Sequence, residues 1–158
     1  MPAHLTRGRR HEAHMEYEDT PAGEERWCDE CRGRIVAYLK REAVHHGRVG
    51  ERPAWHVAPY VSIWAIESGT MSDAIGWWVI CGDLPTDYVS GHGIAHPREA
   101  LRAFVRRWSA FVAAEQRGES LEDWCIGDGS RHAELAPMLE SRARLLLEWA
   151  DDDSCWEP

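Results

Sequence analysis

Basic charge is scarce in this sequence of 158 residues, which has 18 lysine and arginine residues against 27 aspartate and glutamate residues and a formal net charge of -9. Proteins that bind nucleic acids need basic stripes to neutralise phosphates, so this balance argues against a nucleic-acid partner. It also disfavours anionic membrane surfaces and favours a partner with a basic surface. The composition therefore predicts an acidic protein whose partner is not a polyanion.

Long apolar runs and processing signals are lacking as well. No apolar run approaches the roughly 20 residues that span a bilayer. The N-terminal segment also lacks the pattern of a signal peptide, in which a positively charged region and an apolar region precede a cleavage site with small residues. The five cysteines are odd in number and do not have the spacing of a small secreted domain. We therefore expect no membrane association and a cytoplasmic location with reduced thiols.

The signature motifs of several large enzyme classes are also missing. The sequence has no P-loop, no G-x-G-x-x-G, no H-E-x-x-H and no G-x-S-x-G. These motifs bind phosphates, dinucleotides and zinc or carry a serine nucleophile. We expect no cofactor, and the case for an enzyme is weak.

The length fits one domain, and a chain of this size buries roughly 70% of its unfolded surface, which is enough for a proper core. Residues 1–24 are poor in large apolar side chains and cannot bury enough surface to offset their ordering entropy. We expect residues 1–24 to form a disordered leader and residues 25–158 to form a single domain.

Helical periodicity occurs in residues 25–46, 97–117 and 137–150. The first segment places apolar side chains at i, i+3, i+7 and i+11, on one face of a helix, at Cys28, Cys31, Ile35 and Leu39. The second segment begins at a proline, which is favoured in the first helical turn. The third ends in an acidic run that opposes the helix dipole, so we expect its last turn to fray.

Two segments between the first and second helices have the character of strands. Residues 56–68 are apolar on both faces and are broken near Pro59, which cannot donate to a ladder. Residues 75–82 can return beside them as an antiparallel hairpin, which a short third strand near Val57 or Tyr88 can extend. This order predicts an α+β fold with a small antiparallel sheet packed by the helices.

Residues 76–88 run from a dense apolar strand into an acidic segment that contains a proline. Because side chains alternate across a strand, Trp77 and Trp78 point to opposite faces, which indicates a central strand covered on both sides. Two carboxylates, a hydroxyl and a phenol then gather within residues 83–88, where we expect a turn. We expect any functional surface to begin at this turn.

Candidate contact residues come from this turn, from the glycine-containing segment after it and from one aromatic side chain at the end of an element. We expect them to bind a protein partner; they are Trp55, Asp83, Thr86, Asp87, Tyr88, His92 and His96. The competing interpretation is structural. Asp83 and Asp87 can hold the backbone of their own turn, and His96 can cap the next helix.

A small metal- or thiol-dependent enzyme is the alternative hypothesis, with a site at Cys81, Asp83, Asp87, His92 and His96. The spacing of these residues matches no metal-ligand signature. A chain with five cysteines and nine histidines also generates cysteine–histidine pairs by chance. An immunity-like or regulatory protein-binding module that uses the loop from Asp83 to His96 is therefore the leading hypothesis, and an oligomer-building scaffold is a third.

Cys28 and Cys31 form a C-x-x-C motif. A zinc site needs a second pair of ligands, and His45 and His46 lie more than three helical turns away. A thioredoxin-type motif follows a strand, whereas this one lies inside a helical segment. Core packing of both thiols is the favoured interpretation, with metal binding and redox chemistry as alternatives.

Nine tryptophans are many for a chain of this length, and tryptophan is enriched both in cores and at binding hot spots. The tryptophans on strands or helical stripes are expected in the core: Trp64, Trp108 and Trp149. Those at element ends or in loops have less assured burial: Trp27, Trp55, Trp124 and Trp156. For the second group, the favoured interpretation is that the side chains pack against the ends of helices and strands within the protein. The alternative is that they contact a partner.

The run GWWVICGDLPTDY at residues 76–88 is long and specific, and residues 53–55, 60–68, 96–100 and 140–143 support it. Together these segments resemble a bacterial family that is catalogued only as a domain of unknown function. The resemblance covers about residues 27–156 and leaves the N-terminal segment outside. It implies bacterial origin and a compact α+β domain, and it implies no reaction and no catalytic residue.

Overall fold

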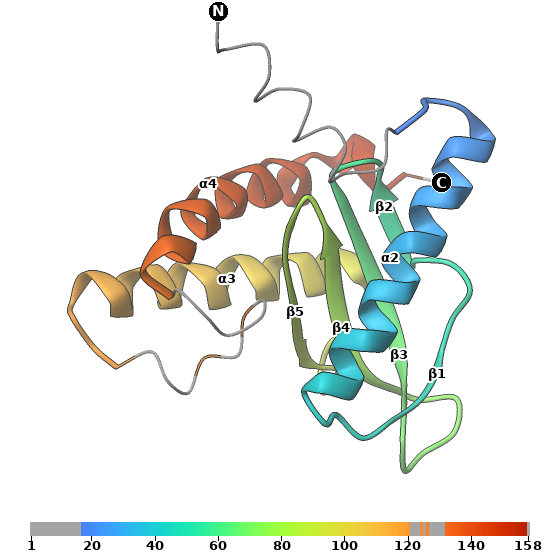
Figure 1. The fold of residues 1–158 in the computed structure, drawn as a ribbon, viewed down its shortest axis with the longest axis horizontal. Coiled ribbons are helices and arrows are strands. Elements are labelled where there is room, and N and C mark those ends of the chain that lie inside the picture. Colours follow the sequence, from blue (N-terminus) through green and yellow to red (C-terminus); the bar gives the residue numbers. More distant parts are fainter. Residues whose placement is uncertain (1–16, 121–123, 125, 127–131, 158) are drawn as a thin grey trace, which may run out of the picture.

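A β-sheet lies between a single helix on one face and a pair of helices on the other (Figure 1). The computed structural model describes residues 17–120, 124, 126 and 132–157. Most of the segment expected as a disordered leader, residues 1–24, lies outside the described residues. The architecture confirms the predicted α+β class with an antiparallel sheet.

Helix α2 (Pro21–Arg41) covers one face of the sheet. It begins before the predicted start at residue 25 because the Thr20 side chain accepts a hydrogen bond from the Gly23 backbone N–H. It ends before the predicted residue 46 because Ala43, with a φ of 54°, turns the chain toward the first strand. The predicted apolar face is correct, and its buried side chains include Cys28, Cys31, Ile35 and Leu39.

The sheet of the described residues has five strands, all paired antiparallel. Strands β3 and β4 form the predicted hairpin, and the break predicted near Pro59 within residues 56–68 is confirmed, because the chain there divides into β2 and β3. Both β1 and β2 pair with the same edge of β3, and β5 pairs with the far side of β4. The strands are β1 (His46–Val49), β2 (Trp55–Val57), β3 (Val61–Ser68), β4 (Ile75–Gly82) and β5 (Leu84–Ser90).

The turn predicted over residues 83–88 is wrong, because strand β5 occupies most of this segment. The chain reverses at Gly82, whose φ of 149° favours glycine, and Gly82 already pairs with Leu84. Pro85 is tolerated because β5 lies at the edge of the sheet. The prediction was based on residue types that favour turns. In the structure, backbone pairing with β4 makes this segment a strand despite those preferences.

Strand β4 divides the interior into two apolar layers. Trp78 and Ile80 pack toward α3 and α4, while Trp77 and Val79 pack toward α2. The alternation follows from the two-residue period of a strand. The prediction that adjacent tryptophans mark a central strand covered on both faces is therefore confirmed.

Helices α3 (Pro97–Gln116) and α4 (His132–Asp151) form the pair on the second face. The bounds of α3 agree with the prediction to within a residue, and the His96 side chain caps it by accepting a hydrogen bond from the Arg98 backbone N–H. Helix α4 begins earlier than predicted and contains Pro137 in its body. Its buried stripe includes Leu139, Ala143 and Leu146, as predicted.

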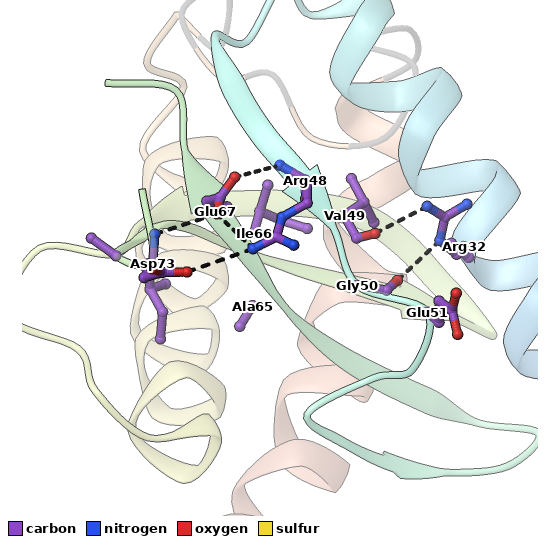
Figure 2. A pocket seen from close by; sticks show the side chains of 11 residues that line it. Arg32, Arg48, Val49, Gly50, Glu51, Ala65, Ile66, Glu67 and Asp73 are labelled. Carbon is purple, nitrogen blue, oxygen red and sulfur yellow. Dashed lines mark hydrogen bonds and ion pairs between the residues drawn. The ribbon is translucent and has the colours of Figure 1, made fainter. Parts of the chain in front are cut away.

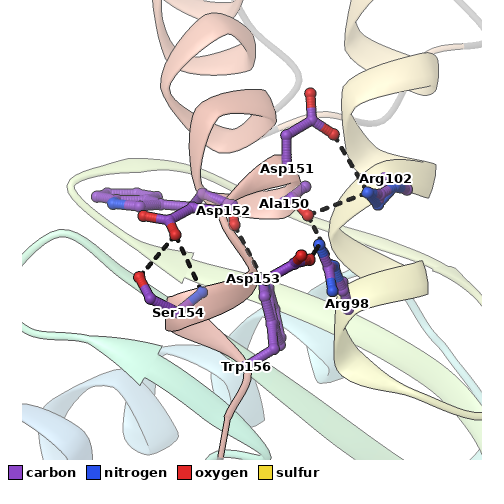
Figure 3. Close-up of polar contacts among 9 residues, drawn as sticks. Arg98, Arg102, Ala150, Asp151, Asp152, Asp153, Ser154 and Trp156 are labelled. Carbon is purple, nitrogen blue, oxygen red and sulfur yellow. Dashed lines mark hydrogen bonds and ion pairs between the residues drawn. The ribbon is translucent and has the colours of Figure 1, made fainter.

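Two arginines of α3 hold the acidic C-terminal end of α4 (Figure 3). Arg98 Nε and an Arg102 guanidinium nitrogen donate to the Ala150 carbonyl at 2.7 and 3.0 Å. The same side chains pair with Asp153 and Asp151 at 2.7 and 3.2 Å. The cations satisfy a carbonyl at the negative end of the helix dipole. These cations from α3 offset the helix dipole of α4, whose own last turn has no basic residue, so α4 remains helical to Asp151 instead of fraying. The 3₁₀ helix η1 (Asp153–Cys155) follows.

The reversal between β4 and β5 gives a prediction about stability. In Gly82→Ala, the added Cβ would lie 2.3 Å from the Tyr60 carbonyl oxygen in a backbone conformation that other residues rarely adopt. We expect the free energy of unfolding to fall by about 2 kcal/mol or more. Gly33→Ala in α2 is the matched control, because its Cβ meets no atom within 4 Å, and it should stabilise the protein by about 0.5–1 kcal/mol. Urea unfolding measures both, and equal effects would contradict the proposed strain.

Candidate functional site

Asp87 lies in the interior, although the sequence suggested it as a surface contact. Its side chain is fully buried on the α3 side of β5. Oδ2 accepts hydrogen bonds from Arg107 Nε at 2.8 Å and from Trp108 Nε1 at 2.9 Å. Burial raises the pKa of the Asp87 carboxyl, and the Arg107 guanidinium opposes this rise. Asp87 therefore anchors α3 to the edge of the sheet and cannot contact a partner.

Thr86 and Tyr88 project from the opposite face of β5, toward α2. Thr86 Oγ1 donates a hydrogen bond to Cys81 Sγ at 3.7 Å. The Tyr88 ring packs against Trp77 and Tyr38, with centroid distances of 5.5 and 5.9 Å. Both side chains are half-buried. Their contacts are those of the layer beneath α2, so they add little to an exposed surface.

The two candidate histidines are both exposed but lie in different surroundings. His92 follows the far end of β5, where its backbone N–H donates to Ser90 Oγ at 3.2 Å. His96 caps α3, and its ring lies 5.9 Å from the ring of Trp156. The sequence placed both histidines in one loop, and the structure brings only His96 to the aromatic residues.

Four aromatic rings meet where β2, the start of β3 and the end of α4 come together. Trp55 stacks on Trp156 with centroids 4.4 Å apart and meets the edge of Trp149 at 6.2 Å. Tyr60 lies 6.4 Å from Trp149. Trp55 Nε1 donates to the Cys155 carbonyl and Trp156 Nε1 donates to the Trp149 carbonyl. The N–H groups are thus bonded within the protein, while the Tyr60 side chain remains 50% exposed.

Asp83 continues this group of rings across the surface. The Asp83 backbone N–H donates to the Tyr60 carbonyl at 2.8 Å. Arg142 Nε donates to the Asp83 carbonyl at 2.8 Å, and its guanidinium pairs with the Asp83 carboxylate at 3.3 Å. Arg142 and Trp149 are two turns apart on the same side of α4. We define the aromatic surface as Trp55, Tyr60, Asp83, His96, Arg142, Trp149 and Trp156.

Three of the seven contact residues proposed from sequence belong to the aromatic surface: Trp55, Asp83 and His96. Sequence reasoning missed Tyr60 and Arg142 as members, and it placed Trp149 in the core although this side chain is only half-buried. The one feature of the sequence that pointed to this surface was the number of tryptophans at the ends of helices and strands. Which ends meet depends on contacts between residues far apart in the chain, such as the hydrogen bond from Trp55 to Cys155.

The residues of the alternative enzyme hypothesis are not brought together. Cys81 is buried under α2, Asp87 is buried on the opposite face of the sheet, and Asp83 is exposed at the reversal between β4 and β5. In the part of the chain that the structure describes, no three histidine, cysteine, aspartate or glutamate side chains are grouped so that they could hold a metal ion. The geometry shows no shared site for these residues.

Comparison with protein-family models finds that residues 22–156 match a domain of unknown function, DUF4826. The chain belongs to this family. Comparison with curated proteins and with solved structures finds no match. The family assignment confirms the resemblance seen in the sequence and supplies no activity, so the interpretation of the DUF4826 domain depends on its own residues.

The DUF4826 domain also has a groove of about 670 Å³ at the edge formed by β1, which sequence reasoning missed (Figure 2). Arg32 Nε donates to the Gly50 carbonyl at one end. At the other end, Glu67 accepts hydrogen bonds from the backbone N–H groups of Arg48 and Asp73, which lower the pKa of the Glu67 carboxyl. Arg48 pairs with Glu67 and Asp73, and Arg32 bonds to the backbone carbonyls of Gly50 and Val49, so the groove does not indicate the charge of a ligand.

The helices of the described part of the DUF4826 domain do not include one long and apolar enough to cross a membrane.

The different positions of Asp83 and Asp87 give a prediction that separates structural from surface roles. Asp87→Ala leaves the Arg107 guanidinium and the Trp108 N–H without their carboxylate, and we expect it to lower the free energy of unfolding by about 3 kcal/mol. Asp83→Ala removes an exposed ion pair and should cost less than about 1 kcal/mol. Chemical denaturation of the two variants measures the difference. Equal losses, or an unaffected Asp87→Ala protein, would contradict the assigned roles.

Proposed function

We propose that this DUF4826 protein is an acidic, cytoplasmic protein-binding module with an immunity-like or regulatory role, and that the aromatic surface is its contact surface. The supporting observation is the exposed ring of Tyr60, which lies beside the half-buried ring of Trp149, while the Tyr60 carbonyl accepts a hydrogen bond from the backbone N–H of exposed Asp83. Of the segment from Asp83 to His96 that the sequence suggested as the contact region, this proposal retains the two end residues, Asp83 and His96, as contacts. The strand between those ends is structural.

The composition of the aromatic surface supports protein binding. Tryptophan, tyrosine and arginine are the residue types most enriched at binding hot spots, and all three meet here. Rings that already contact one another lose little conformational freedom when a partner covers them. Met138, which is 46% exposed, lies one turn before Arg142 on α4 and extends the apolar area.

The charges around the aromatic surface support a partner with a basic surface. The end of α4 and the segment after it carry Asp151, Asp152, Asp153 and Glu157, all exposed. Arg98 and Arg102 pair with only two of these four carboxylates in the described residues. Together with the net charge of -9, this leaves a negative rim that attracts a cationic protein and repels a polyanion.

The proposal is tested by a tagged pull-down from the source organism, followed by a binding measurement with the purified partner. We expect Tyr60→Ala to weaken binding at least tenfold, because it removes an exposed aromatic ring that a partner can cover, and Asp83→Ala to weaken binding to a smaller degree. Met71→Ala is the matched control, since Met71 is 65% exposed and lies in the loop between β3 and β4. Binding should weaken further as salt concentration rises.

Two results would contradict this assignment. One is a partner whose affinity is unchanged in both Tyr60→Ala and Asp83→Ala while Met71→Ala weakens it. The other is the absence of any partner that binds the purified protein directly. Circular dichroism and thermal unfolding of each variant establish that a loss of binding is not a loss of fold.

A further inference from the structure

Helix α2 has an outer side that the described part of the chain leaves uncovered. Its inner side packs on the sheet, and Figure 1 shows the outer side turned to solvent. Four exposed residues of this outer side, Asp29, Gly33, Val36 and Lys40, occupy positions i, i+4, i+7 and i+11. This spacing places them on one face of the helix. We define the α2 face as these four residues.

The middle of the α2 face combines an exposed apolar side chain with a residue that has no side chain. Val36 is 41% exposed. A Cβ added at Gly33 would meet no atom within 4 Å, so the space over this residue is open. Glycine is unfavourable inside a helix relative to alanine, and in the described chain no neighbouring atom requires it here. The close approach of another helix would account for a glycine at this position.

The two ends of the α2 face carry opposite charges. Asp29 lies toward the N-terminal end and Lys40 toward the C-terminal end of the helix. The ion pairs of α2 in the described residues involve Glu24, Arg26 and Arg41, so neither Asp29 nor Lys40 is already paired. Both charges are therefore available to a partner with the complementary pattern.

We propose that a second copy of this chain docks on the α2 face, so that the two α2 helices pack antiparallel across a two-fold axis. Asp29 and Lys40 are equally far along the chain from the midpoint of the α2 face, and so are Gly33 and Val36. An antiparallel pair therefore places Asp29 of each copy opposite Lys40 of the other, and Val36 opposite Gly33. The α2 face is complementary to itself in charge and in shape, which favours a second copy over an unrelated partner.

The small size of this contact limits its strength. A single pair of helices buries less surface than most specific interfaces, so we expect a weak dimer with a dissociation constant of about 10–100 μM. At the low protein concentrations of an unfolding experiment the chain is then monomeric. Because the pairs at both ends are ionic and lie at the edge of the contact, a higher salt concentration should weaken association.

Sedimentation equilibrium of the full chain, from about 1 μM to about 1 mM, measures this association, and we expect a monomer–dimer equilibrium. Asp29→Lys places like charges opposite each other at both ends of the contact and should raise the dissociation constant at least about tenfold. Lys40→Glu should do the same. Glu148→Lys is the matched control, because it reverses the charge of an exposed residue of α4, on the other side of the sheet. It should leave the dissociation constant within about twofold.

Combining the two charge reversals distinguishes a contact between copies from a general effect of charge. When Asp29→Lys and Lys40→Glu are combined, both ion pairs form again with their signs exchanged, and the net charge of the chain stays at -9. We therefore expect the double variant to dimerise again. An equimolar mixture of the two single variants should likewise form a heterodimer, which makes the same test if the double variant is unstable.

The proposal is overturned if the unsubstituted chain stays monomeric over the whole concentration range. It is also overturned if Asp29→Lys leaves the dimer as stable as Glu148→Lys does. A third contradicting result is a double variant that circular dichroism shows to be folded but that stays monomeric. These measurements need no binding partner, so their outcome is independent of the function proposed for the aromatic surface.

Discussion

Strand β4 carries large side chains on both faces, and the burial of both faces determines how the other elements are arranged. Trp78 and Val79 are almost completely buried on opposite sides of the sheet. Full burial of such side chains contributes about 1.5–3 kcal/mol each, and a strand exposed on either face would forfeit it. The hairpin with β3 and the pairing with β5 protect the edges of β4, and the helices cover its faces.

This requirement explains why the acidic side chains near β4 have different roles. Asp87 alternates into the α3 layer, where only a cation and an indole N–H can offset the loss of solvation. Asp83 lies at the reversal between the strands and remains in solvent, paired with Arg142. The charges that hold α3 and α4 together at Arg98 and Arg102 also fix the position of the C-terminal segment (Figure 3). That segment places Trp156 against Trp55, so the aromatic surface is a consequence of how the second face is covered.

Much of the fold could be predicted from the sequence because its local patterns agree with the tertiary contacts. The bounds of β4, its pairing with β3, the start of α3 at Pro97 and the buried cysteine face of α2 all follow from periodicity and capping. Only a short strand near Tyr88 could be predicted where the longer β5 lies, since Asp83, Pro85 and Asp87 have the local preferences of a turn. Its pairing with β4 is a non-local contact that overrides these preferences.

The candidate site was less predictable than the fold. Trp55, Asp83 and His96 were identified by residue type, but the surface that joins them depends on Tyr60, Arg142 and Trp149. These residues come from β-strand ends and from α4, and only the packing of α4 against α3 brings them together. The burial of Asp87 likewise depends on Arg107, a residue of another element with no local sequence link to it.

The most direct test of this account follows the indole N–H signals of the tryptophans by two-dimensional ¹H–¹⁵N NMR while the purified partner is added. Trp55, Trp149 and Trp156 belong to the aromatic surface, whereas Trp64, Trp78 and Trp108 are buried in the two layers. The account predicts that the partner shifts or broadens the first three signals and leaves the second three in place. Unchanged signals from Trp55, Trp149 and Trp156 in the saturated complex would contradict the assignment of the aromatic surface.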